Sequence, residues 1–489
     1  MLGDMQLAAL IGSDALPLPE GGATEIAGLT ADSRAVKPGY LFAALPGTKL
    51  DGTAFIAQAL EKGAAALLVP QGSAVEAGVP VIADRNPRRR LAHMAARFFG
   101  AQPRTIAAVT GTNGKTSVAT FLRQIWAALG EEAASLGTLG IASPKGERPL
   151  GYTTPDPVAL QAELAALAKE GVTHLAMEAS SHGLAQYRLD GAKLTAAGFT
   201  NITRDHMDYH ASFDDYLYAK LRLFGEVMGP GGVAVINADS AQFAEFEAVS
   251  WARGHRVISV GRKGRDICLV STQAHARGQT LALVHDGDNY EVKLPLVGGF
   301  QASNALVAAG LAIGCGADAA KVFAALEKLT GAKGRMEEAA HLANGASVYI
   351  DYAHTPDALE NVLEAMRPHT KKRLHVVFGC GGDRDPGKRP IMGEIAAKLA
   401  DAVYVTDDNP RGEDAGTIRA AIMKGCPGAT EIGDRAKAIE TATAALDTGD
   451  VLVVAGKGHE TGQIIGEKTV PFSDHEAVLA AAKRHGGGA

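Results

Sequence analysis

The sequence predicts an α/β protein of three domains, and three observations lead to that prediction. The chain has 489 residues, more than one hydrophobic core usually serves. Short apolar runs alternate with Ala-rich or amphipathic segments along most of it, a pattern typical of sheets covered by helices. Two Gly-containing stretches, 100–103 and 331–334, interrupt this alternation and indicate linkers.

The first domain is predicted over residues 1–102. A charged segment, 84–90, is expected to precede its last helix, and the domain ends in the first linker. The elements expected there are strands at 41–44, 66–69 and 80–82 and helices over 53–62 and 91–99. This composition is that of a small α/β domain.

The central domain is predicted over residues 103–332. Its apolar runs alternate with helices, which favours a mostly parallel, doubly wound sheet. The expected strands are 106–109, 175–177, 196–199 and 233–236, and the expected helices are 118–129 and 301–315. Four β-like runs interrupt that rhythm and predict an antiparallel segment with a turn at Asp286-Gly287-Asp288: 257–260, 267–270, 281–284 and 290–294.

The third domain is predicted over residues 333–489 as another α/β unit. Its expected strands are 347–350, 374–378, 402–405 and 451–454. Polar or Gly-rich loops follow each of them. Because the carboxyl ends of parallel strands meet at one sheet edge, we expect these loops to converge.

Composition and charge exclude several function classes. The net charge of −6 provides no general basic field, so we expect neither nucleic acid nor an anionic membrane as a partner. No apolar run reaches membrane-spanning length, and the first residues lack the pattern of a signal peptide. The four cysteines are widely separated and form no CxxC pair, which favours a cytoplasmic location.

A phosphate-binding loop is predicted directly after the strand at 106–109. Its backbone N–H groups and the following helix N-terminus suit phosphates, a lysine suits the terminal phosphate and a hydroxyl suits Mg²⁺. The alternative is a chance Gly/Lys turn. The loop residues are Gly111, Thr112, Asn113, Gly114, Lys115, Thr116 and Ser117.

Three further segments of the central domain carry candidate chemistry. Glu178 ends a strand, where it can meet Mg²⁺ or cap the next helix. Residues 203–210 contain Arg, Asp and His and suit metal or phosphate, or form a solvated turn, but they match no zinc signature. From the residues alone, Lys220 is interpreted as an ordinary surface lysine.

The loops of the third domain carry opposite charges. Asp351 and His354 can touch a nucleotide or cap a helix, and the loop 379–385 suits a carboxylate or phosphate unless an internal Asp–Arg pair fills it. Arg411 and Glu460 follow two different strands. An Arg that binds a carboxylate and a Glu that meets an ammonium group suit a zwitterion such as an amino acid.

These segments together resemble the Mur ligase family, ATP-dependent enzymes that form the amide bonds of the peptidoglycan stem peptide. The resemblance covers almost the whole chain and rests on Asp32-Ser-Arg, the GTNGKT loop, 178–182, 201–210, Lys220, Asn304, Arg335, 351–354 and the C-terminal loops. It is strongest to the members that add the third residue. Asp408-Asn-Pro-Arg411 is the loop form associated with meso-diaminopimelate, and lysine-adding relatives usually lack its Arg.

The resemblance implies a small α/β UDP-binding domain, a P-loop central domain and a Rossmann-like C-terminal domain. It implies three small-molecule substrates, UDP-MurNAc-L-Ala-D-Glu, meso-diaminopimelate and ATP, with Mg²⁺ and a CO₂-derived carbamate on Lys220. That carbamate would overturn the surface interpretation of Lys220. We expect a monomer.

Site roles are also implied by the resemblance. Lys115, His206 and Lys220 would be catalytic, and Thr116, Glu178, His206 and carbamylated Lys220 would hold the metal. Besides the phosphate loop, ATP would contact Asn304, Arg335, Asp351 and His354. The UDP-sugar would contact Ser33, residues 48–50, Thr153, Thr154, Ser180, Gln186 and Arg188. Diaminopimelate would contact Arg384, Asp408, Asn409, Pro410, Arg411, Gly456 and Glu460.

One departure from the family pattern lies at Gln301, where Asn is common, so the role of that side chain stays open. Two alternatives to the third-residue ligase also stay open. One is a sibling with the same ATPase core, such as the D-Ala-D-Ala-adding ligase or a folylpolyglutamate synthase, which the 408–411 loop disfavours. The other is a P-loop binding protein without catalysis, which would not need Glu178, His206 and Lys220 together.

Overall fold

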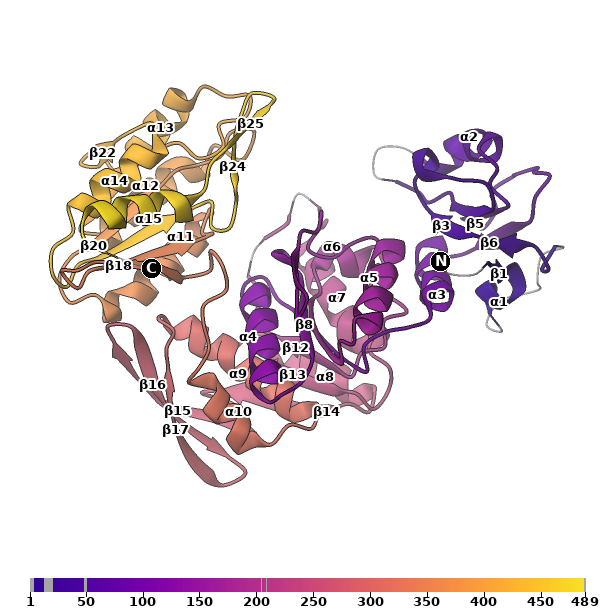
Figure 1. Ribbon diagram of the computed structural model, residues 1–489, viewed down its shortest axis with the longest axis horizontal. Helices are drawn as coiled ribbons and strands as arrows, with labels where there is room; N and C mark the ends of the chain where they lie inside the picture. Colours follow the sequence, from indigo (N-terminus) through magenta and orange to yellow (C-terminus); the bar gives the residue numbers. More distant parts are fainter. Residues whose placement is uncertain (1–3, 13–20, 48–50, 204, 208, 488–489) are drawn as a thin grey trace. The chain divides into compact units, whose positions relative to one another are not determined.

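A computed structural model describes residues 4–12, 21–47, 51–203, 205–207 and 209–487 (Figure 1). The chain divides into two compact units. The first comprises 1–115, 122–259 and 310–317, and the second comprises 116–121, 260–309 and 318–489. Each unit is built around parallel sheets, as the alternation of apolar runs predicts.

The first unit begins with a four-stranded parallel sheet in the order β3-β4-β5-β6. Its strands are β3 (Gly28–Thr30), β4 (Tyr40–Ala43), β5 (Ala66–Pro70) and β6 (Val81–Asp84). The other elements are β1 (Met5–Gln6), α1 (Leu7–Ile11), β2 (Glu25–Ile26), 3₁₀ turns Ser33–Ala35 and Gly52–Phe55, α2 (Ile56–Glu61) and α3 (Pro87–Phe99). The three predicted strands are confirmed. Helix α3 begins four residues before the predicted start, because Asn86 Oδ1 accepts from Arg89 N and Pro87 suits a first helical position.

An 11-stranded sheet follows, and its part in this unit has the order β10-β9-β8-β11-β7-β12-β13-β14. Strands β8, β11, β7, β12 and β13 run parallel, and β7 is buried along its whole length. The strands are β7 (Thr105–Thr110), β8 (Ala133–Gly137), β9 (Gly140–Ser143), β10 (Gly146–Arg148), β11 (His174–Glu178), β12 (Ala196–Phe199), β13 (Val233–Asn237) and β14 (Arg256–Gly261). The helices are α4 (Lys115–Ala128), α5 (Pro157–Lys169), α6 (Ser181–Ala185), α7 (Phe213–Arg222), a π turn Leu223–Val227 and α8 (Phe243–Ala252). The carboxyl ends of β7, β11 and β12 therefore bring the phosphate loop, Glu178 and Thr200 to one edge.

The second unit contains an antiparallel segment, β15 (Ile267–His275), β16 (Gly278–His285) and β17 (Asp288–Leu294). Asp286 and Gly287 have φ of 50° and 87°, as a two-residue hairpin turn requires. The predicted antiparallel segment is wrong for its first run, because β14 pairs in parallel with β15 through Val260 and Gly261. Helices α9 (Gly299–Gly314) and α10 (Ala319–Leu326) follow.

The last sheet of the second unit has the order β18-β19-β23-β20-β21-β22, parallel except for the edge strand β18. Its strands are β18 (Glu337–His341), β19 (Ser347–Asp351), β20 (Leu374–Phe378), β21 (Ala402–Val405), β22 (Thr430–Glu431) and β23 (Val451–Ala455), beside a hairpin of β24 (Gly462–Ile465) and β25 (Lys468–Pro471). The helices are α11 (Pro356–Met366), a 3₁₀ turn Arg367–His369, α12 (Lys388–Leu399), α13 (Ala415–Met423), α14 (Arg435–Ala444) and α15 (Asp474–Arg484). Successive strand residues alternate between two cores, one shared with α11–α13 and the other with α14 and α15. All four predicted strands are confirmed.

Candidate active site

The phosphate loop lies between β7 and α4 and closely approaches the loop that follows β12. A Cβ at Gly111 would lie 1.9 Å from Thr200 Oγ1, so only glycine fits there. Thr112 N donates to Asn201 O at 2.8 Å, and Asn113 N donates to Asn201 Oδ1 at 3.0 Å. These two amides are paired within the protein. Backbone N–H groups that bind a phosphate must therefore come from the part of the loop where α4 begins.

Lys115 lies against its own loop. Its Nζ donates to Gly111 O at 2.8 Å and to Thr112 O at 2.9 Å. Thr116 and Ser117, the two candidate hydroxyls, are buried in the first turn of α4. The strand, Gly-rich turn and helix that the sequence predicts are present, which disfavours a chance turn.

Lys220 is buried on α7, so its interpretation as a surface lysine is wrong. Its side chain is 1% exposed, and Nζ donates to Gly111 O at 2.8 Å. The ammonium also lies 4.5 Å from the centre of the Tyr216 ring. Burial, with the nearby charge of Lys115, holds the pKa of Lys220 well below its usual 10.5, and Asp205 opposes this only in part. A depressed pKa makes the amine available in its neutral, nucleophilic form.

Glu178 is buried at the end of β11 and does not cap the next helix. Its Oε1 accepts from Thr138 N at 2.8 Å and its Oε2 accepts from Thr138 Oγ1 at 3.2 Å. Ser180 caps α6 instead, because its Oγ accepts from Gly183 N. A Cβ at Gly137 would lie 2.1 Å from Glu178 Oε1, so that glycine makes room for the carboxylate.

Four residues of the predicted UDP-sugar set form one network beside Glu178: Thr154, Ser180, Gln186 and Arg188. A fifth, Thr153, contacts Thr138, the residue that donates to Glu178. Thr154 Oγ1 donates to Glu178 O and accepts from Ser180 N. Arg188 Nη1 donates to Thr154 O at 2.7 Å, and its Nη2 donates to Gln186 Oε1 at 2.8 Å.

Two other parts of that set lie apart from this network. Ser33 lies in a turn of the first sheet, where its carbonyl accepts from Lys62 Nζ. Residues 48–50 lie outside the described residues.

The loop that carries His206 contains a cluster of aromatic rings. His206 has φ of 56°, lies 3.4 Å from Asp205 Oδ2 and meets the ring of His182 edge-on at 4.9 Å. Tyr209 lies 4.0 Å from His182 between ring centres. Two charged residues of the loop, Arg204 and Asp208, lie outside the described residues.

Within the described parts of the chain, no three His, Cys, Asp or Glu side chains are placed to share a metal ion. The predicted metal set therefore depends on the Thr116 hydroxyl and on a carbamate at Lys220 as well as on Glu178 and His206.

In the second unit, the predicted nucleotide residues are joined through Gln301. Its Oε1 accepts from Asn304 Nδ2 at 3.1 Å and its Nε2 donates to Arg335 O at 3.1 Å. Gln301 therefore links two of the predicted residues, Asn304 and Arg335.

Arg335, Tyr352 and His354 form a cluster beside Asp351. The Arg335 guanidinium lies 4.6 Å from the Tyr352 ring centre, and the His354 ring meets Tyr352 at 4.7 Å. Asp351 accepts from Met336 N and Ala353 N, and burial raises its pKa. Thr355 caps α11, so Asp351 does not cap that helix.

The loops after β20, β21 and β23 converge, as predicted. Arg411 has φ of 52°, and its Nη1 donates to Gly382 O at 2.9 Å. Asn409 Nδ2 donates to Glu460 Oε2 at 3.0 Å. A Cβ at Gly456 would lie 2.7 Å from Asp408 Oδ2, so the third loop lies directly against the second.

The loop 379–385 is held by its neighbours rather than by an internal Asp–Arg pair. Asp383 Oδ2 accepts from Gly412 N at 3.0 Å, and Arg389 pairs with Glu413 at 2.8 Å. Arg384 is exposed at the tip of this loop. Its side chain is therefore accessible from solvent.

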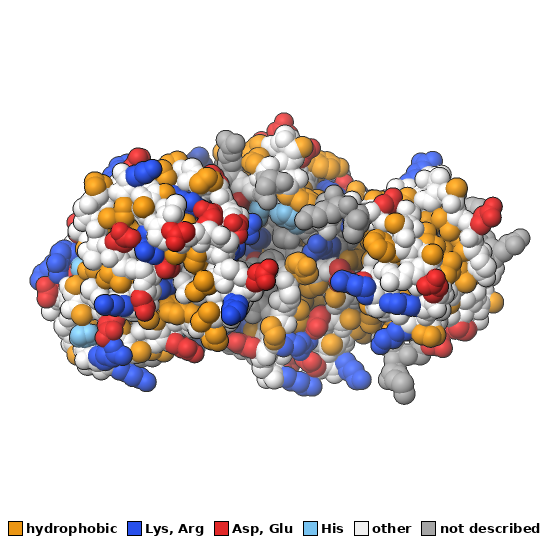
Figure 2. Space-filling view, turned by 90° about the horizontal axis from the view of Figure 1, so that it is seen from above, with side chains coloured by type: hydrophobic (Ala, Val, Ile, Leu, Met, Phe, Trp, Pro, Cys, Tyr) orange, Lys and Arg blue, Asp and Glu red, His pale blue; other side chains and the backbone are white. Residues whose placement is uncertain are grey.

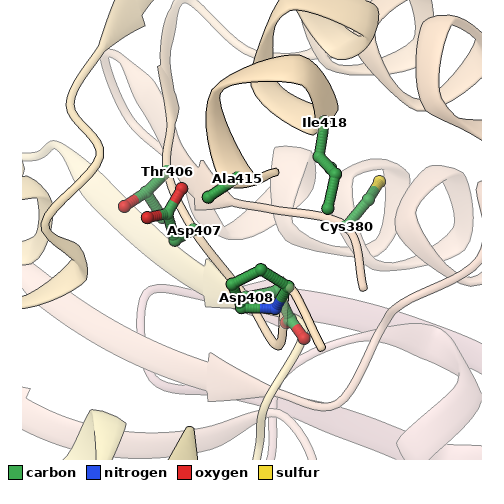
Figure 3. A pocket seen from close by; sticks show the side chains of 7 residues that line it. Cys380, Thr406, Asp407, Asp408, Ala415 and Ile418 are labelled. Atoms are coloured by element: carbon green, nitrogen blue, oxygen red, sulfur yellow. The ribbon is translucent and has the colours of Figure 1, made fainter. Parts of the chain in front are cut away.

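A small pocket lies under the 408–411 loop (Figure 3). Its empty volume of about 150 Å³ is below the size of a site that encloses a whole organic ligand. Asp408 Oδ2 is buried with no hydrogen-bond partner among the described residues. The lining residues are Cys380, Thr406, Asp407, Asp408, Pro410, Ala415 and Ile418.

Sequence reasoning gave no role to several residues that support the site. Thr138 and Tyr216 lie in a turn and a helix that no motif distinguishes, and Asn201 begins the segment 201–210 of the family resemblance but was given no role of its own. Lys457 is 0% exposed and pairs with Glu460 at 2.8 Å, and its one sequence signal is its place between two glycines after a buried strand.

The distribution of charge on the surface and the length of the helices are relevant to the partners that the sequence predicts. On the face seen in Figure 2, blue and red side chains are interspersed rather than gathered in one basic field. Among the described residues, none of the helices has the length and apolar character needed to span a membrane.

Three family models match consecutive parts of the chain. They are "Mur ligase family, catalytic domain" at residues 25–99, "Mur ligase middle domain" at 109–312 and "Mur ligase, glutamate ligase domain" at 334–458. A protein of Bradyrhizobium diazoefficiens named UDP-N-acetylmuramoyl-L-alanyl-D-glutamate--2,6-diaminopimelate ligase is 57% identical, over 98% of this chain and 99% of its own. A protein of Agrobacterium fabrum with the same name is 56% identical over 95% of each chain.

Solved structures agree with these matches. A structure of a ligase with that name has a TM-score of 0.74 and 33% identity, and the match covers 98% of this chain and 99% of the other. A folylpolyglutamate synthase of Mycobacterium tuberculosis has a TM-score of 0.62 at 22% identity over 76% of this chain and 92% of its own, which shows the shared fold alone. The chain belongs to the Mur ligase family and has its three-domain α/β architecture.

Proposed function

We propose that the chain is an ATP-dependent ligase that joins meso-diaminopimelate to the D-glutamate γ-carboxylate of UDP-MurNAc-L-Ala-D-Glu. The observation that carries this proposal is the match along 98% of the chain at 57% identity to a relative named for that reaction. The convergence of Arg411 and Glu460 at one sheet edge supports it, because a carboxylate and an ammonium group of one substrate can meet them together.

In the proposed reaction, the γ-carboxylate attacks the terminal phosphoryl group of ATP and forms an acyl phosphate with release of ADP. The diaminopimelate amine then attacks the acyl carbon, loses a proton and expels phosphate. Lys115 and His206 would bind and orient the transferred phosphoryl group. No protein nucleophile is needed, since both bond-forming groups come from substrates.

The residues at the edge of the central sheet fit a bound Mg²⁺. Glu178 and the Thr116 hydroxyl offer the oxygen ligands that this ion prefers, and a carbamate on Lys220 would add another. When bound, Mg²⁺ would neutralise charge that develops on the transferred phosphoryl group. His206 completes the proposed metal set.

Carbamylation of Lys220 is part of this proposal. The neutral Nζ would attack the carbon of CO₂ and release one proton, which converts an amine into an anionic carbamate. The lowered pKa of Lys220 supports this step, because the neutral amine is the reactive form. In its present contact Nζ donates to Gly111 O.

The remaining assignments are proposed on the same basis. We propose three domains over 1–102, 103–332 and 333–489, supported by the three matched segments. The UDP-sugar would meet Ser33, Thr153 and the Thr154–Arg188 network. ATP would meet the phosphate loop, Asn304, Arg335, Asp351 and His354. Diaminopimelate would meet Arg384, the 408–411 loop, Gly456 and Glu460. A cytoplasmic monomer is part of the proposal.

An ADP-release assay tests the function. We expect ADP release that needs ATP, UDP-MurNAc-L-Ala-D-Glu and diaminopimelate together, with much slower turnover when lysine replaces diaminopimelate. Equal turnover with lysine would exclude the assigned role of Arg411. ATP binding without turnover under any combination would favour the non-catalytic P-loop protein.

A further inference from the structure

Lys457 is a fully buried lysine whose ammonium group binds two side chains of the proposed diaminopimelate site. It follows Gly456 directly after β23, and its side chain is 0% exposed. Its Nζ donates to Glu460 Oε2 at 2.8 Å and to Asn409 Oδ1 at 3.0 Å. Burial of a charge is costly unless partners compensate it, and here both partners belong to loops that would face the substrate.

The contact with Lys457 fixes the orientation of the Asn409 amide. Asn409 Oδ1 accepts from Lys457 Nζ and from Ile464 N at 2.9 Å, and neither of these groups can accept a hydrogen bond. The Nδ2 group must therefore point the other way, where it donates to Glu460 Oε2 at 3.0 Å. The asparagine has one orientation that satisfies every contact.

As a result, the two oxygens of the Glu460 carboxylate differ in their hydrogen bonds. Oε2 takes both the ammonium of Lys457 and the amide of Asn409. Among the described residues, the hydrogen bonds to this carboxylate reach only Oε2. The Glu460 side chain is 31% exposed, so a ligand can reach this carboxylate from solvent and Oε1 is the oxygen left to receive it.

The same network includes the Arg411 backbone. Ile464 donates its N–H to Asn409 Oδ1, and its carbonyl accepts from Arg411 N at 3.0 Å. Lys457, through Asn409, thus helps to set the separation between Glu460 and Arg411. That separation decides which zwitterion can bridge them.

We propose that Lys457 is a positioning residue for the amino-acid substrate. It holds Glu460 so that Oε1 receives the ammonium group of a zwitterion whose carboxylate meets Arg411. This inference rests on the proposed function and adds to it a residue that touches no substrate.

Steady-state kinetics of Lys457→Met test the inference, since methionine keeps the length but has no charge and no donor. We expect the KM for diaminopimelate to rise about tenfold or more, while the KM values for ATP and the UDP-linked precursor stay unchanged. Lys398→Met, on the exposed side of α12, is the matched control and should alter none of them. In a Glu460→Gln background, Lys457→Met should add less than about twofold, because the two residues act together.

Lys457→Gln, which keeps a donor, is the second variant to use if Lys457→Met does not fold. For this variant too, we expect the KM for diaminopimelate to rise while the other two KM values stay unchanged. An unchanged KM for diaminopimelate, a parallel rise of all three KM values or full additivity with Glu460→Gln would overturn the positioning role. If the wild-type protein does not turn over diaminopimelate, the proposed function fails and this assignment with it. If the wild type turns it over and Lys457→Met does so equally well, only the assignment fails.

Discussion

Lys220 Nζ and the carbonyl oxygen of Gly111 lie 2.8 Å apart, so a side chain of α7 contacts the first residue of the phosphate loop. The two residues are separated by 109 positions in the sequence. A charge change at Lys220 therefore acts directly on the loop proposed to bind ATP.

Lys220→Ala is expected to lower kcat by about a hundredfold or more, because the proposed carbamate and its charge are lost. Short-chain carboxylic acids added to the variant should restore part of the rate, since their carboxylate can occupy the vacated space. ADP release measured with and without acetate or formate checks this. Lys193→Ala, at an exposed lysine, is the control, and wild-type rates in Lys220→Ala would refute the carbamate.

Gly137→Ala should lower kcat by tenfold to a hundredfold, on the order expected for a displaced catalytic group. The new Cβ would lie 2.1 Å from Glu178 Oε1 and would force the carboxylate to move. Kinetics at varied Mg²⁺ should show a raised metal requirement. Gly151→Ala is the matched control, because a Cβ there meets nothing within 4 Å. If both variants behave alike, Glu178 does not act on the metal.

Arg411→Ala should raise the KM for diaminopimelate and reduce the preference over lysine, because lysine lacks the second carboxylate that Arg411 would bind. The ratio of kcat/KM for the two amino acids is the measurement. Arg419→Ala removes an arginine that pairs with Asp407 and Glu431 instead, and it should leave the ratio unchanged. If the ratio of kcat/KM values in Arg411→Ala equals that of the wild type, residues other than Arg411 determine the preference for diaminopimelate.

His369→Phe should destabilise the second unit most clearly at neutral and higher pH. His369 Nε2 accepts from Gly298 N at 2.9 Å, and Nδ1 donates to His275 O at 2.6 Å, so only the neutral ring makes both contacts. Burial lowers the pKa of His369 below its usual 6.5. The folded protein therefore binds fewer protons than the unfolded chain, and this stabilisation is complete above pH 6.5 and lost as the pH falls.

Thermal unfolding at several pH values checks that prediction. At pH near 7.5 the loss should be about 1–3 kcal/mol, the cost of a buried N–H left without its acceptor. The difference between wild type and variant should shrink towards pH 5. His485→Phe, at an exposed histidine, should show no such trend. A difference that is constant with pH would exclude titration of His369.

The parallel strands were the most predictable part of the fold. The runs at 196–199, 374–378 and 402–405 coincide with β12, β20 and β21 to the residue, because strands inside a parallel sheet are rich in apolar residues, with His375 as the one polar residue among these three runs. Strand β18 and the β24–β25 hairpin were not predicted, since their residues are mostly half-buried or exposed and carry no continuous apolar run.

The candidate site was predictable where chemistry follows a strand end. Gly111 and Glu460 lie in such loops, and Glu178 and Asp351 are the last residues of β11 and β19. The burial of Lys220 was not predictable from the residues, because its environment is formed by a loop 109 positions away. Pairings of this kind depend on tertiary structure, and no local pattern encodes them.

The backbone amides of Thr112 and Asn113 both pair with Asn201, so the phosphate loop and the loop after β12 are joined and move together. Thr203 N also donates to Thr112 Oγ1 at 2.9 Å, which extends this connection towards His206. A ligand that shifts either loop must shift both. Coupling between two binding sites is reciprocal. If the UDP-linked precursor changes the affinity for the nucleotide by some factor, the nucleotide changes the affinity for the precursor by the same factor. Any such coupling between the two substrates would have its structural origin in the hydrogen bonds that join these two loops.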